Sequence, residues 1–459
     1  MSLKQSDSKR RMLFIILALA LPTMIEQLLQ TAVQYIDVAM VGSLGTDATT
    51  VVGSTSTVNW LVGSTVSALG VGFLSIIAKA IGASDIQRVK RVASQTVLSV
   101  LVCGTVFTLL PLILSPFVPS LMNVEKHLRA ETSTYFAILY TPMLMRTASI
   151  IFGTALRAAG DTKTPMRVGI LVNILNVVLN FFFIYPTRDI TIFGYDINVF
   201  GFGMGTNGAA AASAIAYAFG GIAITIAIYK HPLLSPRGQS IRPDTSILHP
   251  CLKVALPNML QRFTTSFGYV TFASMINSVG SVATAAHTFA NTVESAFYVP
   301  GYGMQTAAAT LTGNYYGSRD KSSMKEFTSM ILKIEVFLMV ISGGLLFAFA
   351  PSIMKIFSSD PKVISLASTV LRMVALSEPF YGVSIIIEGV LFGIGQTVTP
   401  FKYNVIGMWG VRIIGTFICT QLLSFGLIGA WACMIAHNLL LFVLYVIHYK
   451  KGKWNPLNV

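Results

Sequence analysis

Twelve long apolar segments, separated by short polar connections, dominate the sequence. They lie at about 13–42, 50–81, 92–118, 132–156, 165–185, 205–229, 249–277, 283–316, 327–349, 363–392, 401–422 and 426–448. A helix of roughly 20 apolar residues is long enough to cross the hydrocarbon core of a bilayer. Because lipid offers no hydrogen-bond partners, each segment must satisfy its own backbone, which predicts an α-helix. The sequence therefore predicts an all-α integral membrane protein with twelve transmembrane helices.

The composition agrees with this prediction and excludes other classes. Charged residues make up only 11% of the 459 residues and hydrophobic residues 54%, whereas soluble domains have about 25% charged residues. The net charge of +14 would suit a nucleic-acid-binding protein only if the basic residues were clustered on one soluble face. They are instead scattered between the apolar segments. We therefore expect the lipid bilayer as a partner and no nucleic acid.

Lysine and arginine are distributed unevenly among the connections. The two ends of the chain and the connections after even-numbered segments hold most of them. The connections after odd-numbered segments hold only Lys126, Arg129, Arg188, Lys355 and Lys362. Cytoplasmic loops carry the excess of lysine and arginine in membrane proteins. We therefore expect a multi-pass protein of the cell (plasma or inner) membrane with both termini in the cytoplasm.

The two halves of the chain repeat each other at a constant offset of 235 residues. The matches form four clusters, which include the pairs Pro22/Pro257, Gly45/Gly280, Gly82/Gly317 and Gly160/Gly395. Each half has six segments, so both halves enter the membrane in the same direction, as a parallel repeat with its pseudo-twofold axis along the membrane normal. We expect an N-lobe at 1–230, a cytoplasmic linker at 231–246 and a C-lobe at 247–459.

Two six-helix lobes related in this way enclose a central cavity that rocking exposes to each side of the membrane in turn. This architecture predicts a transporter. No GxxxxGK[ST] phosphate loop is present, so we expect an ion gradient to supply the energy. The sequence also has no recognisable nucleophile–base or metal constellation, and we expect no enzyme, cofactor or metal centre. A channel stays an alternative, which a conductance far above transporter turnover would reveal.

Polar side chains inside the first half of the chain fall on helical stripes. A charge at membrane depth costs about 2.5–3.5 kcal/mol, so such side chains need a reason. One stripe, with spacings of 4, 4 and 3 residues, consists of Glu26, Gln30, Gln34 and Asp37. A stripe in the fifth segment and a hydroxyl in the sixth add Asn173, Asn176, Asn180 and Ser213. Residues three and four apart share one helix face.

These groups allow a functional and a structural interpretation. A carboxylate, amide oxygens and a hydroxyl that converge in one lobe could hold a small cation, or Asp37 could take up and release a proton. The alternative is a hydrogen-bonded cluster that only holds helices together.

The second half of the chain has polar residues of its own within the apolar segments. Asn291, Glu294 and Tyr298 share a face of the eighth segment. Arg262 in the seventh segment could neutralise Glu294 or Glu378, either as an ion pair that fixes the C-lobe or as part of a substrate site. Glu335 and Glu388 lie nearer the cytoplasmic ends of their segments and could extend to the interface. We predict a substrate cavity lined by Glu26, Gln30, Gln34, Asn173, Arg262, Asn291, Glu294, Tyr298 and Glu378.

Several motifs in this order resemble those of a known family. The chain is similar over essentially its full length to the multidrug and toxic compound extrusion (MATE) transporters, particularly their bacterial DinF-like branch. The residues that carry the resemblance are Pro22, the run 37–45, Gly82-Ala83, the run 156–165 and Gly208-Ala209-Ala210. Each motif alone is modest, and their order along twelve segments makes the match specific.

The resemblance implies a secondary active antiporter that exports organic cations or amphipathic xenobiotics by alternating access. It gives Asp37 the role of the coupling residue of the N-lobe, with Asn176, Asn180 and Ser213 beside it. Asn180 stands where some members have aspartate, which removes one negative charge and favours H⁺ over Na⁺ as the coupling ion. We expect a proton-coupled monomer with small-molecule substrates.

Two other transport readings stay open. Na⁺ could be the coupling ion, held at Asp37, Asn176 and Asn180. Alternatively, the protein could move a lipid-linked precursor across the bilayer, since related folds in the wider superfamily do so. The basic residues available for a diphosphate headgroup within the segments are Arg146, Arg262, Arg372 and Arg412.

Overall fold

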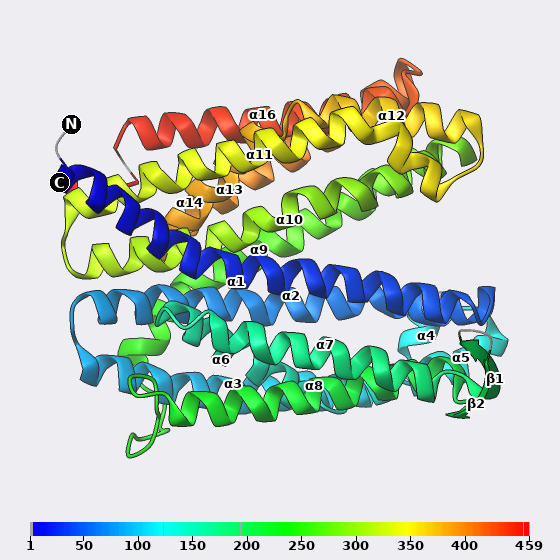
Figure 1. Cartoon of the computed structure of the whole chain (residues 1–459), viewed down its shortest axis with the longest axis horizontal. Helices are drawn as coiled ribbons and strands as arrows, with labels where there is room; N and C mark the ends of the chain where they lie inside the picture. Colours follow the sequence, from blue (N-terminus) through cyan, green and yellow to red (C-terminus); the bar gives the residue numbers. More distant parts are fainter. Residues whose placement is uncertain (1–2, 123, 193–194, 453, 459) are drawn as a thin grey trace. The chain divides into compact units, whose positions relative to one another are not determined.

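The computed structural model describes residues 3–122, 124–192, 195–452 and 454–458. The elements of the first half are α1 (Leu3–Gly42), α2 (Thr46–Gly82), α3 (Ile86–Leu114), α4 (Val118–Leu121), η1 (Lys126–Leu128), α5 (Arg129–Tyr140), α6 (Met143–Ala158), α7 (Lys163–Phe183), β1 (Pro186–Ile192), β2 (Tyr195–Phe202) and α8 (Gly205–Lys230) (Figure 1). Those of the second half are α9 (Thr245–Asn277), α10 (Ser281–Gly317), α11 (Lys321–Phe357), α12 (Pro361–Ala375), α13 (Glu378–Gly393), α14 (Val398–Val405), η2 (Ile406–Ile413), α15 (Ile414–Phe417), η3 (Ile418–Leu422), α16 (Gly426–Lys450) and η4 (Pro456–Asn458).

The long helices correspond to the predicted spans. Among the described residues, eight helices are long and apolar enough to cross a membrane, and ten spans result if each of two bent helix pairs counts as one. The bent pairs are 126–140 with α6, at 45°, and α12 with α13, at 54°. The more polar helices α9 and α10, of 33 and 37 residues, occupy the positions of the seventh and eighth predicted spans. The helical membrane fold is confirmed.

One element differs from the all-α prediction. The connection between α7 and α8 forms an antiparallel hairpin of β1 and β2, in which Arg188 pairs with Val199 and Asp189 with Asn198. Asn198 Nδ2 also donates to Asp189 Oδ1 at 2.7 Å. The sequence Asp189-Ile190-Thr191-Ile192 alternates polar and apolar residues, which is the period of a strand and not of a helix. The hairpin is too short to be recognised against twelve long apolar segments.

Contacts divide the chain into two compact units. The C-unit contains Met1–Gln27, Leu74–Asp85 and Pro250–Val459, and the N-unit contains Leu28–Phe73 and Ile86–His249. The start of α1 and the end of α2 therefore cluster with the second half of the chain. The sequence halves and the compact units coincide only in part, and the lobe boundaries at 231–246 stay a prediction.

Within the C-unit, the end of α2 crosses the end of α10 at two glycines that the sequence repeat relates. A Cβ atom on Gly82 would lie 1.8 Å from the carbonyl oxygen of Asn314, and a Cβ on Gly317 would lie 2.0 Å from that of Lys79. The contact is reciprocal, because Lys79 and Asn314 are themselves 235 residues apart. Reciprocal contacts of this kind arise where a twofold axis passes through an interface. The crossing is direct structural evidence for the parallel repeat.

Each unit is built around one central helix. In the C-unit, α10 packs against α11, α12 and α13, and the core includes Ala286, Leu371 and Trp431. In the N-unit, α8 packs against α5, α6 and α7, around a core that includes Val51 and Phe136. Some polar residues of these central helices, such as Thr206 of α8 and Glu294 of α10, are therefore buried within their own unit.

Candidate functional site

A hydrogen-bonded cluster joins α1, α7 and α8 in the N-unit. Asn180 Nδ2 donates to Asp37 Oδ1 at 2.6 Å and lies 3.3 Å from Asn176 Oδ1. The Asn176 amide is 3.1 Å from Ser213 Oγ. Asn176 and Asn180 are buried, whereas Asp37 and Ser213 are half-buried. The structure therefore brings together the four residues that the sequence analysis grouped around Asp37.

Helix geometry and close packing explain this convergence. Asn176 and Asn180 are four residues apart in α7 and so lie on one face. The helix α8 approaches the end of α7 at Gly208, where a Cβ would lie 2.4 Å from the carbonyl oxygen of Phe183. Because only glycine permits that approach, Gly208 sets the position of Ser213, which follows on the same helix.

The Asn176 amide can be placed in two orientations. In one, its Nδ2 faces Ser213 and its oxygen faces the Asp37 carboxyl group. In the other, its Nδ2 donates to Asp37 Oδ1 at 2.9 Å and to Oδ2 at 3.1 Å, while Ser213 Oγ donates to the amide oxygen at 3.1 Å. An ionised carboxylate only accepts hydrogen bonds, so it selects the second orientation. The first orientation puts two acceptors face to face and requires a proton or a cation between them.

The surroundings of Asp37 provide amides and hydroxyls in place of a fixed positive charge. In the described part of the chain, no lysine or arginine lies within ion-pairing distance of its carboxyl group. The side-chain oxygen of Asn180 is buried without a hydrogen-bond partner among these described residues. A group without a resident counter-ion can change its charge by exchanging a proton or a cation. This arrangement is chemically suited to reversible binding.

The other polar residues predicted on the first and fifth segments lie around this cluster in different environments. Gln30 and Gln34 are exposed on α1, whereas Glu26 and Asn173 are half-buried. The hydrogen bonds described around Asp37 do not involve these four side chains. Their assignment to a substrate cavity stays a prediction.

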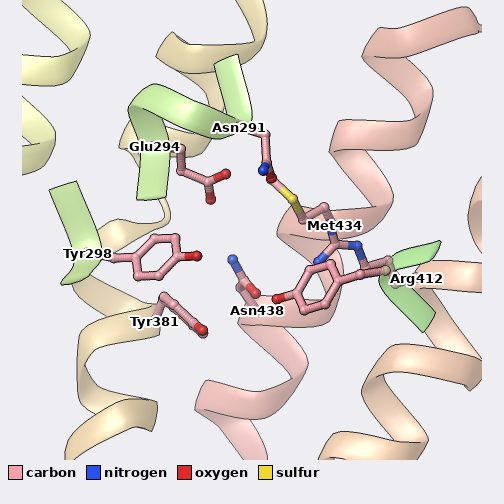
Figure 2. A pocket seen from close by; sticks show the side chains of 8 residues that line it. Asn291, Glu294, Tyr298, Tyr381, Arg412, Met434 and Asn438 are labelled. Carbon is pink, nitrogen blue, oxygen red and sulfur yellow. The ribbon is translucent and has the colours of Figure 1, made fainter. Parts of the chain in front are cut away.

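A second polar site lies inside the C-unit. A small cavity of about 20 Å³ is lined by Tyr269, Asn291, Glu294, Tyr298, Tyr381, Arg412, Met434 and Asn438. That volume is sufficient for about one water-sized species. Figure 2 shows Glu294 and Arg412 on opposite sides of the pocket, with the Tyr298 hydroxyl directed into it. Three residues predicted for the substrate cavity, Asn291, Glu294 and Tyr298, therefore line one pocket.

Arg412 is the cation of this pocket. It is only 3% exposed, and its guanidinium carbon lies 4.1 Å from the ring centroid of Phe272 and 4.8 Å from that of Tyr269. Its Nε has no hydrogen-bond partner among the described residues. Contacts between a cation and aromatic faces strengthen when water is removed. The two rings hold the guanidinium in place, and no carboxylate of the described residues forms an ion pair with it.

The prediction that Arg262 neutralises Glu294 or Glu378 is wrong. Arg262 Nε donates to Asn258 Oδ1 at 2.9 Å, and its electrostatic partner is Glu388. Arg262 therefore faces α13, which carries Glu388, and residue spacing alone does not reveal this orientation. Within the described residues, Arg262 and Glu378 are also not among those that line the pocket.

A second correction concerns Glu335. The prediction that it extends to the interface is wrong, because it is 0% exposed and enclosed within the C-unit. A position near the end of a segment indicates access to the interface only if that helix face is turned to the surroundings. Here the face of α11 that carries Glu335 is packed against α13.

Sequence reasoning missed five lining residues: Tyr269, Tyr381, Arg412, Met434 and Asn438. Met434 and Asn438 are four residues apart in α16, a spacing that indicates a shared face. Arg412 is a single basic residue in an apolar segment, and the sequence analysis assigned it only to a possible lipid headgroup site. The packing of the helices against one another decides which of them contribute residues to the pocket.

The arginines proposed for a lipid headgroup do not form one basic site within the C-unit. Arg412 lines the pocket, Arg262 bonds to Asn258, and Arg372 Nε donates to the Phe347 carbonyl oxygen at 3.2 Å. In the N-unit, Arg146 bonds to Asn59 and stacks on Tyr217. Nor do the described residues contain a group of three or more His, Cys, Asp or Glu side chains that could hold a metal ion.

Comparisons with solved structures agree with this fold. The chain is similar to an outward-facing multidrug resistance MATE family transporter of the MOP superfamily, with a TM-score of 0.88, 22% identity and coverage of 97% of this chain and 96% of the other. It is also similar to a MOP superfamily transporter from Pyrococcus furiosus, with a TM-score of 0.87 at 22% identity over the same shares of the two chains.

Sequence comparisons extend the similarity to curated relatives. The probable multidrug resistance protein NorM of Thermotoga maritima is 28% identical over 440 residues, which cover 96% of this chain and 92% of the relative. The probable multidrug resistance protein YoeA of Bacillus subtilis is 24% identical over 452 residues, covering 94% and 92%. The MatE family model matches twice, at residues 22–182 and 257–418, which start 235 residues apart and together make up more than half of the chain. The chain therefore belongs to the MatE family of multi-pass membrane transporters and is not an enzyme.

Proposed function

We propose that this protein exports organic cations or amphipathic xenobiotics across the cell membrane in exchange for protons. The relatives named above are called multidrug resistance proteins, which supports small-molecule substrates for this chain. In the proposal the protein works as a monomer with both termini in the cytoplasm. The N-lobe (1–230) and C-lobe (247–459) rock about the linker at 231–246.

The observation that carries the proposal is the contact of Asp37 with Asn180 and Asn176. When Asp37 is ionised, both amides donate to it. When it is protonated, the amide of Asn176 turns its oxygen toward the carboxyl group, and the hydrogen bonds between α1 and α7 rearrange. Proton binding thereby changes the contacts between two helices that line the proposed substrate path. Substrate occupies the cavity when Asp37 is ionised and leaves when it is protonated from outside.

The membrane potential adds to the driving force. Moving one elementary charge across the membrane is worth about 2.3 kcal/mol per 100 mV. A single titrating carboxyl group can therefore bias the two states by more than tenfold at an ordinary potential. No second ionised group is needed at the Asp37 cluster.

A second candidate is coupling to Na⁺ at the same cluster. The observation that favours it is the buried side-chain oxygen of Asn180, to which no described residue donates a hydrogen bond. Together with Asp37 and Ser213 Oγ it offers the carboxylate, carbonyl and hydroxyl oxygens that hard cations prefer. The single negative charge of the cluster favours the proton.

The test is transport into reconstituted vesicles with the proton and sodium gradients imposed separately. We expect a pH gradient alone to drive export of a fluorescent organic cation, and Asp37→Asn to abolish this export. The matched control is Asp47→Asn, because the Asp47 side chain is 69% exposed at the start of α2. Full pH-driven export by Asp37→Asn would refute the proposal, and export driven only by sodium would favour the second candidate.

A further inference from the structure

Glu335 is a buried carboxyl group without a hydrogen-bond partner in the described part of the chain. It lies in the middle of α11 and is 0% exposed. Neither Oε1 nor Oε2 has a hydrogen-bond partner among the described residues. Transfer of an ionised carboxylate into such surroundings costs far more than a folded protein can compensate, so the group binds a proton instead. The geometry therefore requires the neutral acid at this position.

Two glycines on neighbouring helices make room for this side chain. A Cβ on Gly301 of α10 would lie 2.7 Å from Glu335 Oε1, and a Cβ on Gly382 of α13 would lie 3.2 Å from the same oxygen. Both helices thus present bare backbone to the carboxyl group. The Glu335 side chain occupies a place formed by three helices, and it is not a surface group that happens to be covered.

The carboxyl group of Glu388, also in the C-unit, has surroundings that can stabilise an ionised carboxylate. Glu388 Oε1 accepts from Gln261 Nε2 at 2.5 Å and from Asn404 Nδ2 at 3.3 Å, and its Oε2 accepts from Gln305 Nε2 at 3.0 Å. Arg262 adds a positive charge nearby. Glu388 and Glu335 lie in the same unit, yet only Glu388 has the donors that an anion needs.

Glu378 connects Glu335 with the pocket. It is the first residue of α13, directly after the 54° bend that separates α13 from α12. It is 1% exposed, and its Oε2 has no partner. Its carboxyl group interacts electrostatically with both Glu335 and Glu294. Broken helices in transporters mark positions where backbone and side chains face a binding site.

The charges around these three carboxyl groups do not balance. The titratable and charged residues on the helices packed against α11 are His287, Glu294, Tyr298, Tyr302, Tyr315 and Tyr316 on α10, Lys362 and Arg372 on α12, and Glu378, Tyr381 and Glu388 on α13. Arg372 is exposed and donates to a carbonyl oxygen, and Glu388 belongs to the amide network described above. Lys362 is exposed near the start of α12, and Arg412 is the cation that lines the pocket with Glu294. One guanidinium can compensate one of the three carboxylates.

We propose that Glu335 and Glu378 form a second proton-binding site of this transporter, within the C-unit. Glu335 holds a proton in the conformation described here. When the bend between α12 and α13 changes, Glu335 releases the proton to Glu378 and the pocket, and the site is reloaded from the other side of the membrane. The exchange step rests on the proposed function, whereas the protonation of Glu335 does not.

Infrared spectroscopy of the full-length protein in lipid vesicles tests the protonation directly. The carbonyl stretch of a protonated carboxylic acid is distinct from that of a carboxylate. We expect wild type to have such a band at neutral pH and Glu335→Gln to lose the part of its intensity that Glu335 contributes. Glu326→Gln is the matched control, because Glu326 is exposed on the same helix. An unchanged band in Glu335→Gln would overturn the proposal.

If Glu335→Gln fails to fold, Glu335→Met provides the same comparison. Methionine has a similar length, has no carboxyl group and suits an apolar interior. A band of unchanged intensity in this variant overturns the proposal just as it would in Glu335→Gln.

Transport stoichiometry tests whether the proton is exchanged. Each coupled proton contributes about tenfold substrate accumulation per pH unit of gradient. We expect Glu335→Gln to lose about one such factor, while Glu326→Gln keeps the wild-type slope. An unchanged slope in Glu335→Gln would overturn the exchange step.

The two proposals fail in distinguishable ways. Loss of the proposed function appears as pH-driven export that survives Asp37→Asn, whereas the infrared band of Glu335 is measured without any transport.

Discussion

The two halves of the chain share a packing contact but not a polar site. The repeat that relates Gly82 to Gly317 also relates Asp37 to Phe272, Asn176 to Val411 and Asn180 to Gly415. Phe272 is buried, and its ring contacts the guanidinium of Arg412 at 4.1 Å. The second half thus has an aromatic ring beside a fixed cation where the first half has an acid among amides.

This difference separates two kinds of constraint. Close backbone approach at the crossing excludes every side chain larger than hydrogen, so both halves have glycine there. A polar site has no such requirement, because different helices can supply its residues. In the C-unit the acids lie on α10, α11 and α13, whereas the N-unit combines α1 with α7. The two halves therefore share the packing contact, whereas their polar sites lie on different helices.

The largest effect on stability should come from adding a side chain where α2 and α10 cross. Gly82→Ala and Gly317→Ala each place a Cβ within about 2 Å of a backbone carbonyl oxygen, which side-chain rotation cannot relieve. We expect each to lower stability by about 3 kcal/mol or more, as measured by thermal unfolding in detergent. Gly344→Ala is the control, since nothing lies within 4 Å of its Cβ position. Unequal effects at the two related glycines would contradict the twofold crossing.

A smaller effect on stability should distinguish Glu388, which accepts hydrogen bonds, from Glu335, which accepts none from the described residues. Glu388→Leu leaves the amides of Gln261, Gln305 and Asn404 without their acceptor. A buried donor that loses its partner costs about 1–3 kcal/mol, so we expect a clear drop in the unfolding temperature. Glu335→Leu removes a group without partners and should leave that temperature unchanged or raised. Equal losses in both variants would show that Glu335 has bonding partners after all.

Within the N-unit, two asparagines of one stripe should differ in their effect on transport. Asn180 donates to Asp37 at 2.6 Å, whereas the hydrogen bonds around Asp37 do not include Asn173. A hydrogen bond to a charged group is worth about 1.5–3 kcal/mol, so Asn180→Ala should slow pH-driven export about tenfold or more. Asn173→Ala should stay near the wild-type rate in the same vesicle assay. If Asn173→Ala is the slower variant, the cluster has been assigned to the wrong face of α7.

The smallest effect should occur at the surface of the N-unit, outside the membrane spans. Arg91 and Ser246 bond to Asp244 and hold the pKa of its carboxyl group below the ordinary 3.8. Because the pKa is lowered by folding, the stabilisation is present above 3.8 and is lost as the pH falls through the lowered value. Asp244→Asn should therefore reduce the unfolding temperature slightly at neutral pH and not in acid. A large drop would contradict the view that exposed ion pairs contribute little.

The sequence alone determined the twelve spans, the parallel repeat and the group of residues around Asp37. Length and apolarity are properties of single segments, and spacings of three and four assign side chains to one helix face without knowledge of any partner. The Asp37 cluster was predictable because Asn176 and Asn180 share a face and stand beside Ser213 on the next helix along the chain.

Only the tertiary structure decided the rest. It placed Arg262 near Glu388 and directed Arg412 into the pocket with Glu294. It also enclosed Glu335 between Gly301 and Gly382. Each of these outcomes depends on the rotation of one helix against another that is distant in sequence. Such rotations are set by the shapes of all the side chains between the helices, and a one-dimensional pattern of spacing does not contain them.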